Sequence, residues 1–262
     1  MSSAKKHPYH LVQPSPWPVV GALSLFVLAI GAILAMHHQS SLVFFIGIAM
    51  LLFTMVAWWR DVIREAKSEH NDVVRHGFRL GMALFILSEV AFFAAFFWAY
   101  FDAALIPKEV NGMVWPPKSI HTLDPFDLPY LNTLLLLLSG TTVTWAHHAI
   151  SEGKIQDMMR QTALTIALGV VFLMVQAYEY HHASFAFKGG IYPSVFYMAT
   201  GFHGFHVFVG VLFLTVSWFR ARAGHFTAKD HFGFEGAAWY WHFVDVVWLF
   251  LFVSIYWWGS GS

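Results

Sequence analysis

The chain has 262 residues, of which 58% are hydrophobic and 11% are charged, and its 15 acidic residues balance its 15 basic ones. Soluble chains carry about 25% charged residues, so this composition excludes a globular protein surrounded by water and indicates an integral membrane protein. The balanced charge favours neither a nucleic-acid partner nor any strongly charged one. Because the sequence has no cysteine, disulfides and thiolate-bound metals are excluded, and any redox centre would depend on its 16 histidines.

Seven apolar segments are long enough to cross a bilayer. An α-helix rises about 1.5 Å per residue, so a hydrocarbon core of about 30 Å requires roughly 20 apolar residues. We therefore predict an all-α protein with seven transmembrane helices: Trp17–Met36, Leu42–Trp59, Leu80–Ile106, Leu128–His148, Thr162–Tyr180, Ile191–Phe219 and Ala237–Trp258. The predicted parts are an N-terminal cytoplasmic tail (1–16), a two-helix bundle (17–59), a cytoplasmic loop (60–79) and a five-helix bundle (80–258).

The basic residues predict the orientation of the chain, since cytoplasmic loops retain lysine and arginine. Most of the 15 lie in the N-terminal tail and in the loops after the second, fourth and sixth predicted helices. The opposite side holds only Lys108, Lys118 and Lys188. We expect the N-terminus on the cytoplasmic or matrix side and, with an odd number of helices, the C-terminus outside.

Glu89 lies inside the third predicted helix, in an apolar stretch. It follows Leu80 by nine residues, which corresponds to about 14 Å and places it near the middle of the bilayer. Because a bare charge costs roughly 2.5–3.5 kcal/mol at that depth, we expect a protonated carboxyl or one that hydrogen-bonds another helix. Two roles stay open: a contact that fixes helix packing, and a carboxyl that exchanges protons. A proton relay along this helix would need further carboxylates, and none precedes Asp102.

Other polar groups lie in or beside the last two predicted helices. His242 and Asp245 are three residues apart and can meet on one helix face. His203 and His206 have the same spacing and could bind a metal. Two imidazoles without a third ligand are weak evidence, however, so no metal site is predicted. We interpret these four residues, together with Glu235, as structural polar groups.

Short motifs rich in tryptophan and histidine occur along the whole chain. They are HPYHLV (7–12), PSPWP (14–18), WWRDVIRE (58–65), SEV (88–90), WPP (115–117), LNT (131–133), TWAHH (144–148), ATGFHG (199–204) and HFGFEGAAWYWHFVDVVW (231–248). In their order and their uncommon residues they resemble subunit III of the haem-copper cytochrome c oxidases of bacteria and mitochondria. One departure is Gly236, where members of the family usually have alanine.

The resemblance implies a seven-helix fold in which a V-shaped cleft, holding phospholipid, separates the first two helices from the other five. It also implies two partners: the catalytic subunit I, which carries the haems and one copper centre, and subunit II, which carries the other copper. The chain itself would bind no cofactor besides phospholipid and would transfer no electrons. Its membrane would be the inner membrane of a bacterial cell or of a mitochondrion.

Site residues follow from the same resemblance. Glu89 matches the family's reactive intramembrane carboxylate near the lipid cleft. Such a subunit would preserve turnover of the oxidase by supporting proton uptake into subunit I and by guiding oxygen along lipid. Contacts with lipid headgroups are implied for Trp58, Trp59, Glu65, His70, Arg79, Arg220 and His225.

Three other functions stay open. Subunit III of a quinol oxidase lacks the first two helices, and the intact segment Pro14–Trp59 argues against it. An independent proton-coupled transporter or channel would account for Glu89 and Asp245, and it predicts proton flux from the purified chain in liposomes. A haem-binding protein that used His203 and His206 would show a Soret band in the isolated chain.

Overall fold

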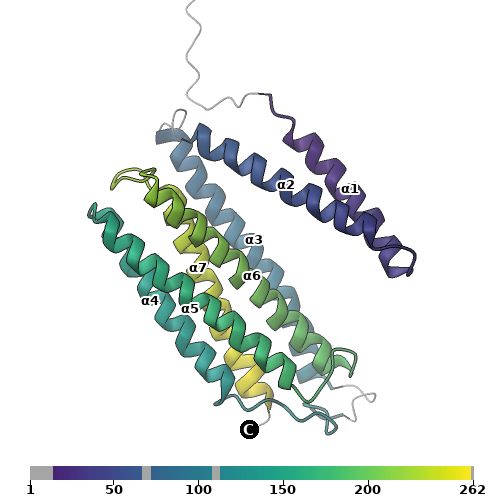
Figure 1. Cartoon of the computed structure of the whole chain (residues 1–262). Helices are drawn as coiled ribbons and strands as arrows, with labels where there is room; N and C mark the ends of the chain where they lie inside the picture. The colour runs from purple at the N-terminus through teal and green to yellow at the C-terminus, as the bar shows by residue number, and fades with distance from the viewer. Residues whose placement is uncertain (1–13, 67–71, 108–112, 261–262) are drawn as a thin grey trace, which may run out of the picture. The chain divides into compact units, whose positions relative to one another are not determined.

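The structure is a computed structural model that describes residues 14–66, 72–107 and 113–260. Within these ranges it contains seven α-helices and no β-strand, which confirms the predicted all-α class (Figure 1). The helices are α1 (Trp17–Met36), α2 (Leu42–Glu65), α3 (Asp72–Leu105), α4 (Leu128–Ser151), α5 (Ile155–His182), α6 (Ile191–Arg222) and α7 (Phe232–Leu251). A π-helical turn, Phe252–Trp257, and a 3-10 turn, Trp258–Ser260, continue α7.

Six of the described helices are long and apolar enough to cross a membrane: α1, α2, α3, α5, α6, and α7 with its extension. The chain is therefore a multi-pass membrane protein. α4 has 24 residues but lies outside this group, although its sequence contains the run Leu134–Leu138. Polar side chains interrupt α4 on both sides of that run, among them Asn132 and Ser139.

Several helices extend beyond the apolar segments from which they were predicted. The largest differences are that α2 ends at Glu65 rather than Trp59, α3 begins at Asp72 rather than Leu80, α5 begins at Ile155 rather than Thr162, and α7 begins at Phe232 rather than Ala237. Hydropathy marks only the part of a helix that lies in hydrocarbon, whereas backbone hydrogen bonding propagates through the polar turns at each end. As a consequence, Arg79 lies within α3 rather than at its end.

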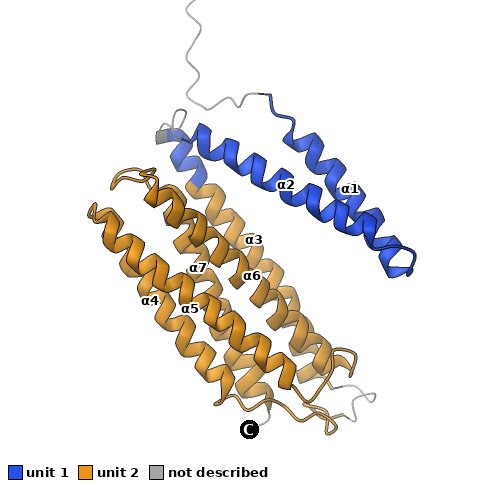
Figure 2. Cartoon of the chain, viewed as in Figure 1, with its two compact units in different colours: residues 1–78 blue, residues 79–262 orange. Residues whose placement is uncertain are grey.

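The chain forms two compact units, residues 1–78 and residues 79–262 (Figure 2). In the first unit α1 packs closely against α2. Gly47 of α2 faces α1, and a Cβ atom at this position would lie 2.6 Å from the Cα of Leu28. The buried hydroxyls of Ser24 and Thr54 lie 3.3 Å apart, one from each helix. Small residues that let two backbones approach, together with polar contacts, are the usual basis of helix association in lipid.

The second unit contains the rest of α3 and the helices α4 to α7. α7 is the most buried of its candidate membrane spans. α4 and α6 each lie against both α5 and α7. Contacts between aromatic rings join α3 to α7: Phe85 with Tyr240, Phe93 with Phe243, and Phe97 with Phe250.

Two tryptophans of α7 fill the centre of the second unit. Trp241 and Trp248 are fully buried. Their indole N–H groups donate hydrogen bonds of 2.9 Å to hydroxyls of α4, Trp241 to Ser139 and Trp248 to Thr133. A buried indole N–H needs such a partner, because lipid offers none. α4 therefore turns the hydroxyls of Thr133 and Ser139 inward and exposes Leu131, Leu134, Leu137 and Leu138.

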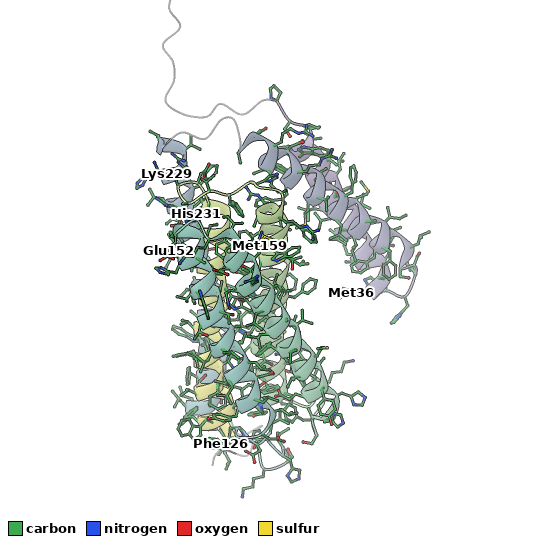
Figure 3. All side chains as sticks on the ribbon, turned by 60° about the vertical axis from the view of Figure 1, so that its left-hand side comes forward. Met36, Phe126, Glu152, Met159, Lys229 and His231 are labelled. Atoms are coloured by element: carbon green, nitrogen blue, oxygen red, sulfur yellow. The ribbon has the colours of Figure 1, made fainter. Side chains whose placement is uncertain are left out.

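Figure 3 shows the two ends of the second unit, with Glu152 and Lys229 near one end and Phe126 at the other. Between α4 and α5 the chain reverses in a short turn, in which Gly153 has φ +77°, a left-handed conformation that favours glycine. In the same turn Lys154 Nζ lies 2.6 Å from a carboxylate oxygen of Glu152. The hydrogen bond from Lys154 lowers the pKa of Glu152.

Candidate functional site

Glu89 of α3 forms a polar pair with His206 of α6. Its Oε2 lies 2.9 Å from Nε2 of His206, and the two side chains are 21% and 9% exposed. Ser88 also donates a longer hydrogen bond of 3.4 Å to Glu89 Oε1. Glu89 was predicted either to be protonated or to hydrogen-bond another helix, and the structure shows the hydrogen bond. Its partner was not predicted, although His206 had been identified separately as a structural polar group.

The second nitrogen of His206 determines how many protons the pair holds. Nδ1 lies 2.6 Å from the carbonyl oxygen of Phe202 in the preceding turn. A carbonyl only accepts hydrogen bonds, so Nδ1 carries a proton. One further proton then lies between Glu89 Oε2 and His206 Nε2, either as carboxylic acid and neutral imidazole or as carboxylate and imidazolium. Both arrangements have zero net charge, which lowers the cost of placing the pair in a membrane-spanning segment.

Aromatic rings surround the imidazole of His206. Its ring centroid lies 4.9 Å from that of Phe93, 5.7 Å from that of Phe92 and 6.4 Å from that of Tyr240, which is stacked with it. These rings come from α3 and α7, so the pair is enclosed by three helices. The site therefore consists of an almost buried imidazole and a partly exposed carboxyl that share a proton.

His203 lies one turn before His206 on α6 but has different contacts. It is fully buried, its Nε2 lies 3.1 Å from the carbonyl oxygen of Val244, and its ring packs against Phe172 and Trp248. The two imidazoles therefore serve separate partners. Among the described residues there is no group of three or more histidine, aspartate or glutamate side chains that could hold a metal ion.

His242 and Asp245 of α7 lie on one helix face, as predicted, with Nδ1 and Oδ2 3.8 Å apart. Two neighbours on α4 were not predicted from the sequence. Thr144 Oγ1 lies 3.2 Å from His242 Nε2, and a Cβ atom at Gly140 would lie 2.6 Å from Asp245 Oδ2. The absence of a side chain at Gly140 lets the carboxyl approach α4, so this group joins two helices.

The residues predicted to contact lipid are divided between the two units. Trp58 and Trp59 of α2 are exposed, and Glu65 is the last residue of that helix. Arg79 and Arg220 belong to the second unit, as does His225. His70 lies outside the described residues.

Arg79 pairs with Glu235, and this pairing was not predicted although both residues were candidates. The Nε and Nη2 atoms of Arg79 donate hydrogen bonds of 3.2 Å and 2.9 Å to Glu235 Oε2. The Arg79 side chain is still 54% exposed. The guanidinium of Arg220 lies 4.6 Å from the ring centroid of Phe226, a cation–π contact. Both cations are thus held in defined positions.

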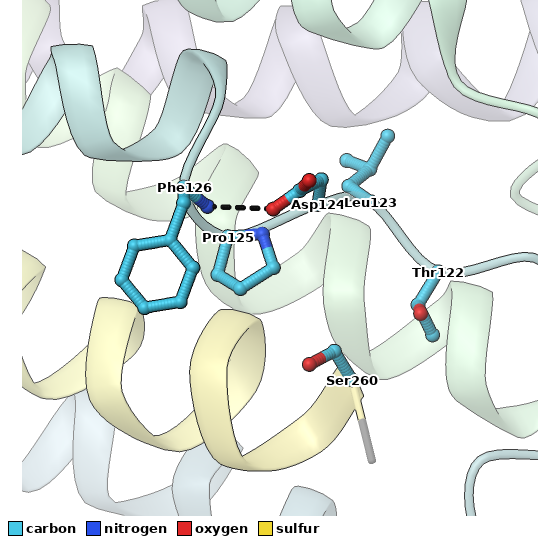
Figure 4. A pocket seen from close by; sticks show the side chains of 6 residues that line it. All are labelled: Thr122, Leu123, Asp124, Pro125, Phe126 and Ser260. Carbon is cyan, nitrogen blue, oxygen red and sulfur yellow. Dashed lines mark hydrogen bonds between the residues drawn. The ribbon is translucent and has the colours of Figure 1, made fainter. Parts of the chain in front are cut away.

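A pocket of about 260 Å³ lies at the end of the second unit where α4 begins (Figure 4). Its wall is formed by residues 122–126 and Ser260. Within this wall the backbone N–H of Phe126 donates a hydrogen bond of 2.9 Å to Asp124 Oδ1. The residues of the predicted sites lie elsewhere.

The sequence is similar to one family along nearly its whole length. The family described as cytochrome c oxidase subunit III matches residues 7–260. Cytochrome c oxidase subunit 3 of Dugong dugon is 53% identical over 256 residues, which cover 97% of this chain and 98% of the relative. The protein of the same name from Marchantia polymorpha is 54% identical over 264 residues, covering 99% and 100%. The relative from Lemur catta is 52% identical over 258 residues, covering 98% and 94%. The chain therefore belongs to the cytochrome c oxidase subunit III family.

Proposed function

We propose that the chain serves cytochrome c oxidase as a subunit without a redox centre, bound to subunits I and II, and that it supports proton uptake through Glu89 and His206. The observation that carries this proposal is the contact of 2.9 Å between these side chains, which joins two membrane-spanning helices. Membership of an oxidase family makes the chain part of an oxidoreductase complex. Among the polar contacts described above, this pair joins a carboxyl to an imidazole of another helix, and it holds a proton that can be exchanged.

The chemistry of the pair suits local proton exchange. Moving the shared proton from Glu89 Oε2 to His206 Nε2 changes a neutral pair into an ion pair without changing the net charge. The carboxyl is 21% exposed, so a water molecule or a polar group of a neighbouring subunit can reach it and exchange this proton. On α3 the next carboxylate after Glu89 is Asp102, roughly 20 Å further along the helix axis. The pair therefore acts as a local site that supports uptake into subunit I, and not as a complete path across the membrane.

Substitutions at Glu89 in the assembled oxidase test this role. Glu89→Gln keeps a side chain that can hydrogen-bond Nε2 of His206 but removes the exchangeable proton, whereas Glu89→Ala removes both. We expect both variants to assemble and to lower turnover modestly, by less than tenfold, with Leu87→Ala, an exposed residue of α3, as the matched control. Normal turnover in Glu89→Gln and a loss only in Glu89→Ala would show a packing role instead. Failure of Glu89→Gln to assemble would also overturn the proposal.

We also propose that Arg79 and Arg220 hold phospholipid phosphates, with Trp58, Trp59 and His225 at the headgroup level. About half of the Arg79 side chain is exposed beyond its contact with Glu235, and an arginine near a helix end can contact lipid phosphates. Glu65 and His70 complete the set that the resemblance implies.

Phospholipid content tests this second proposal. Replacing Arg79 and Arg220 together by alanine should lower the phospholipid that purifies with the oxidase and shorten its active lifetime. Arg160→Ala is the matched control, because Arg160 is exposed on α5 and pairs with Asp157. An unchanged phospholipid content in the double variant would contradict the headgroup assignment.

We further propose that α4 is a seventh span, so that the chain has the predicted two-helix and five-helix bundles and the lipid-holding cleft between them. With 24 residues, α4 is about 36 Å long. Its outward leucines suit lipid, and α5 and α7 cover its polar face. Placing the N-terminus on the cytoplasmic or matrix side follows the excess of basic residues there. Single cysteines at Lys118 and Lys154, which lie before and after α4, should react with impermeant thiol reagents from opposite sides; labelling from the same side would contradict a seventh span.

A further inference from the structure

The interior of the second unit contains buried polar atoms without a hydrogen-bond partner among the described residues. Asn132 of α4 is fully buried, and neither Nδ2 nor Oδ1 of its amide is paired. Glu179 of α5 is 2% exposed, and its Oε2 is unpaired. The Nδ1 atom of His203 on α6 is unpaired as well. Buried polar groups almost always have partners, because leaving them unpaired is costly.

Each of these residues is linked to the indole of Trp248: His203 directly, Asn132 through its chain neighbour Thr133, and Glu179 through Tyr256. The Nε1 of this indole donates to Thr133, the neighbour of Asn132, and its ring centroid lies 5.1 Å from that of His203. On another side its centroid lies 5.6 Å from that of Tyr256, whose hydroxyl donates a hydrogen bond of 2.7 Å to Glu179 Oε1. The three unpaired groups therefore belong to α4, α5 and α6 and lie in the same part of the interior, around Trp248.

The packing of α4 against α5 gives a second, independent indication that Asn132 and Glu179 are near each other. The hydroxyls of Thr142 and Thr165 lie 2.7 Å apart across this antiparallel pair. Moving ten residues back along α4 leads to Asn132, and moving the same number forward along α5 leads to residue 175, about one turn before Glu179. Both side chains are buried, so they face the interior at a similar depth.

The unpaired atoms need both donors and acceptors. The amide of Asn132 offers two donors and an acceptor, and Oε2 of Glu179 accepts when it is ionised. His203 donates from Nε2 to the carbonyl of Val244, so its Nδ1 is an acceptor in the neutral ring. Within the described ranges, no group of three or more histidine, aspartate or glutamate side chains is placed to hold a metal ion. Water can donate and accept in the same place, and buried waters typically make about three hydrogen bonds.

We propose that the interior of the second unit holds ordered water that joins Asn132, Glu179 and His203. This hydrated site is separate from the Glu89–His206 pair and does not depend on the role proposed for that pair. It completes the hydrogen bonding of Glu179, whose Oε1 already accepts a hydrogen bond from Tyr256. It also gives Asn132, within the LNT motif, a specific role, because its amide holds the water on the side of α4.

A substitution at Asn132 distinguishes a hydrated interior from a dry one by the sign of its effect. Leucine has nearly the shape of asparagine and needs no partner. In a dry interior Asn132→Leu removes an unpaired amide, so the assembled oxidase should retain this subunit to a higher temperature. With water present, the same change leaves the water and Glu179 without a partner, and we expect the midpoint of subunit loss to fall by roughly 5 °C. An unchanged or higher midpoint would overturn the proposal.

A double-substitution cycle and a direct observation complete the test. Asn132→Leu and Glu179→Gln should be non-additive, because both disturb the same water. Thr142→Val combined with Glu179→Gln is the matched control and should be additive, since Thr142 pairs with Thr165. A density map of the assembled oxidase that resolves water should show a peak within hydrogen-bond distance of Asn132 and Glu179. A direct bond between these two side chains, or no peak, would refute the site.

Discussion

A single methyl group at Gly47 should separate α1 from α2. The added Cβ atom would lie 2.6 Å from the Cα of Leu28, and a backbone atom cannot turn away as the end of a side chain can. To restore an ordinary contact the helices must part by about 1 Å, which forfeits up to about half of the dispersion attraction across the contact. Overpacking costs about 1–3 kcal/mol, and a contact with backbone atoms belongs in the upper part of that range, about 2–3 kcal/mol. The higher helix propensity of alanine returns about 1 kcal/mol. We expect Gly47→Ala to weaken the helix pair by about 1–2 kcal/mol.

Cysteine cross-linking in membranes that contain the assembled oxidase measures this effect. The chain has no cysteine of its own, so Ser24→Cys with Thr54→Cys introduces its only thiols, at hydroxyls that lie 3.3 Å apart. Under mild oxidation, Gly47→Ala should lower the cross-linking rate about 5- to 30-fold, the factor that corresponds to one or two kcal/mol. Ile46→Ala is the control, because this residue neighbours Gly47 on α2 but its side chain is exposed. Equal rates in the two variants would refute the steric argument.

Two predictions concern the second unit and use the midpoint of thermal subunit loss from the oxidase. Trp248→Phe keeps a buried ring but leaves Thr133 without its indole partner, so we expect a loss of about 0.6 kcal/mol from the hydrogen bond plus a larger loss from the unfilled volume. Restoring stability by adding Thr133→Val would identify the hydrogen-bond part. Gly140→Ala should cost less than Gly47→Ala, because the obstacle is the carboxyl of Asp245, which can rotate away. An equal cost would show that this carboxyl is held rigidly.

Hydropathy predicted the interior of each helix, because lipid requires both apolar side chains and internally paired backbones. It could not predict the ends. The first turns of α3, for example, contain Asp72 and Arg75, which hydropathy alone assigns to a loop although the backbone is helical. The last polar turns of α2 (60–65) and the first turns of α5 (155–161) were missed for the same reason.

The pairing within the candidate site was missed because a sequence gives the depth of a residue but not its direction around the helix. Glu89 lies near the middle of α3 and His206 near the middle of α6. Comparing depths between helices would have made them candidates for a pair. Arg79 and Glu235 could have been matched in the same way, since both lie in the early turns of their helices.

α4 shows how a helix of a membrane protein can join its neighbours through polar side chains. Lipid is as apolar as a leucine side chain, so burying leucine inside a bundle brings little gain, whereas burying a paired hydroxyl joins two helices. α4 follows this logic by exposing Leu131, Leu134, Leu137 and Leu138 and by burying Thr133, Ser139 and Thr142, which hydrogen-bond Trp248, Trp241 and Thr165. Asn132 lies on the same inward side, and its amide has no partner within the part of the chain that the structure describes. Thr133, Ser139 and Thr142 each have a hydrogen-bond partner, as buried polar groups require. A water molecule bound to the amide of Asn132 would give the fourth inward polar residue a partner as well.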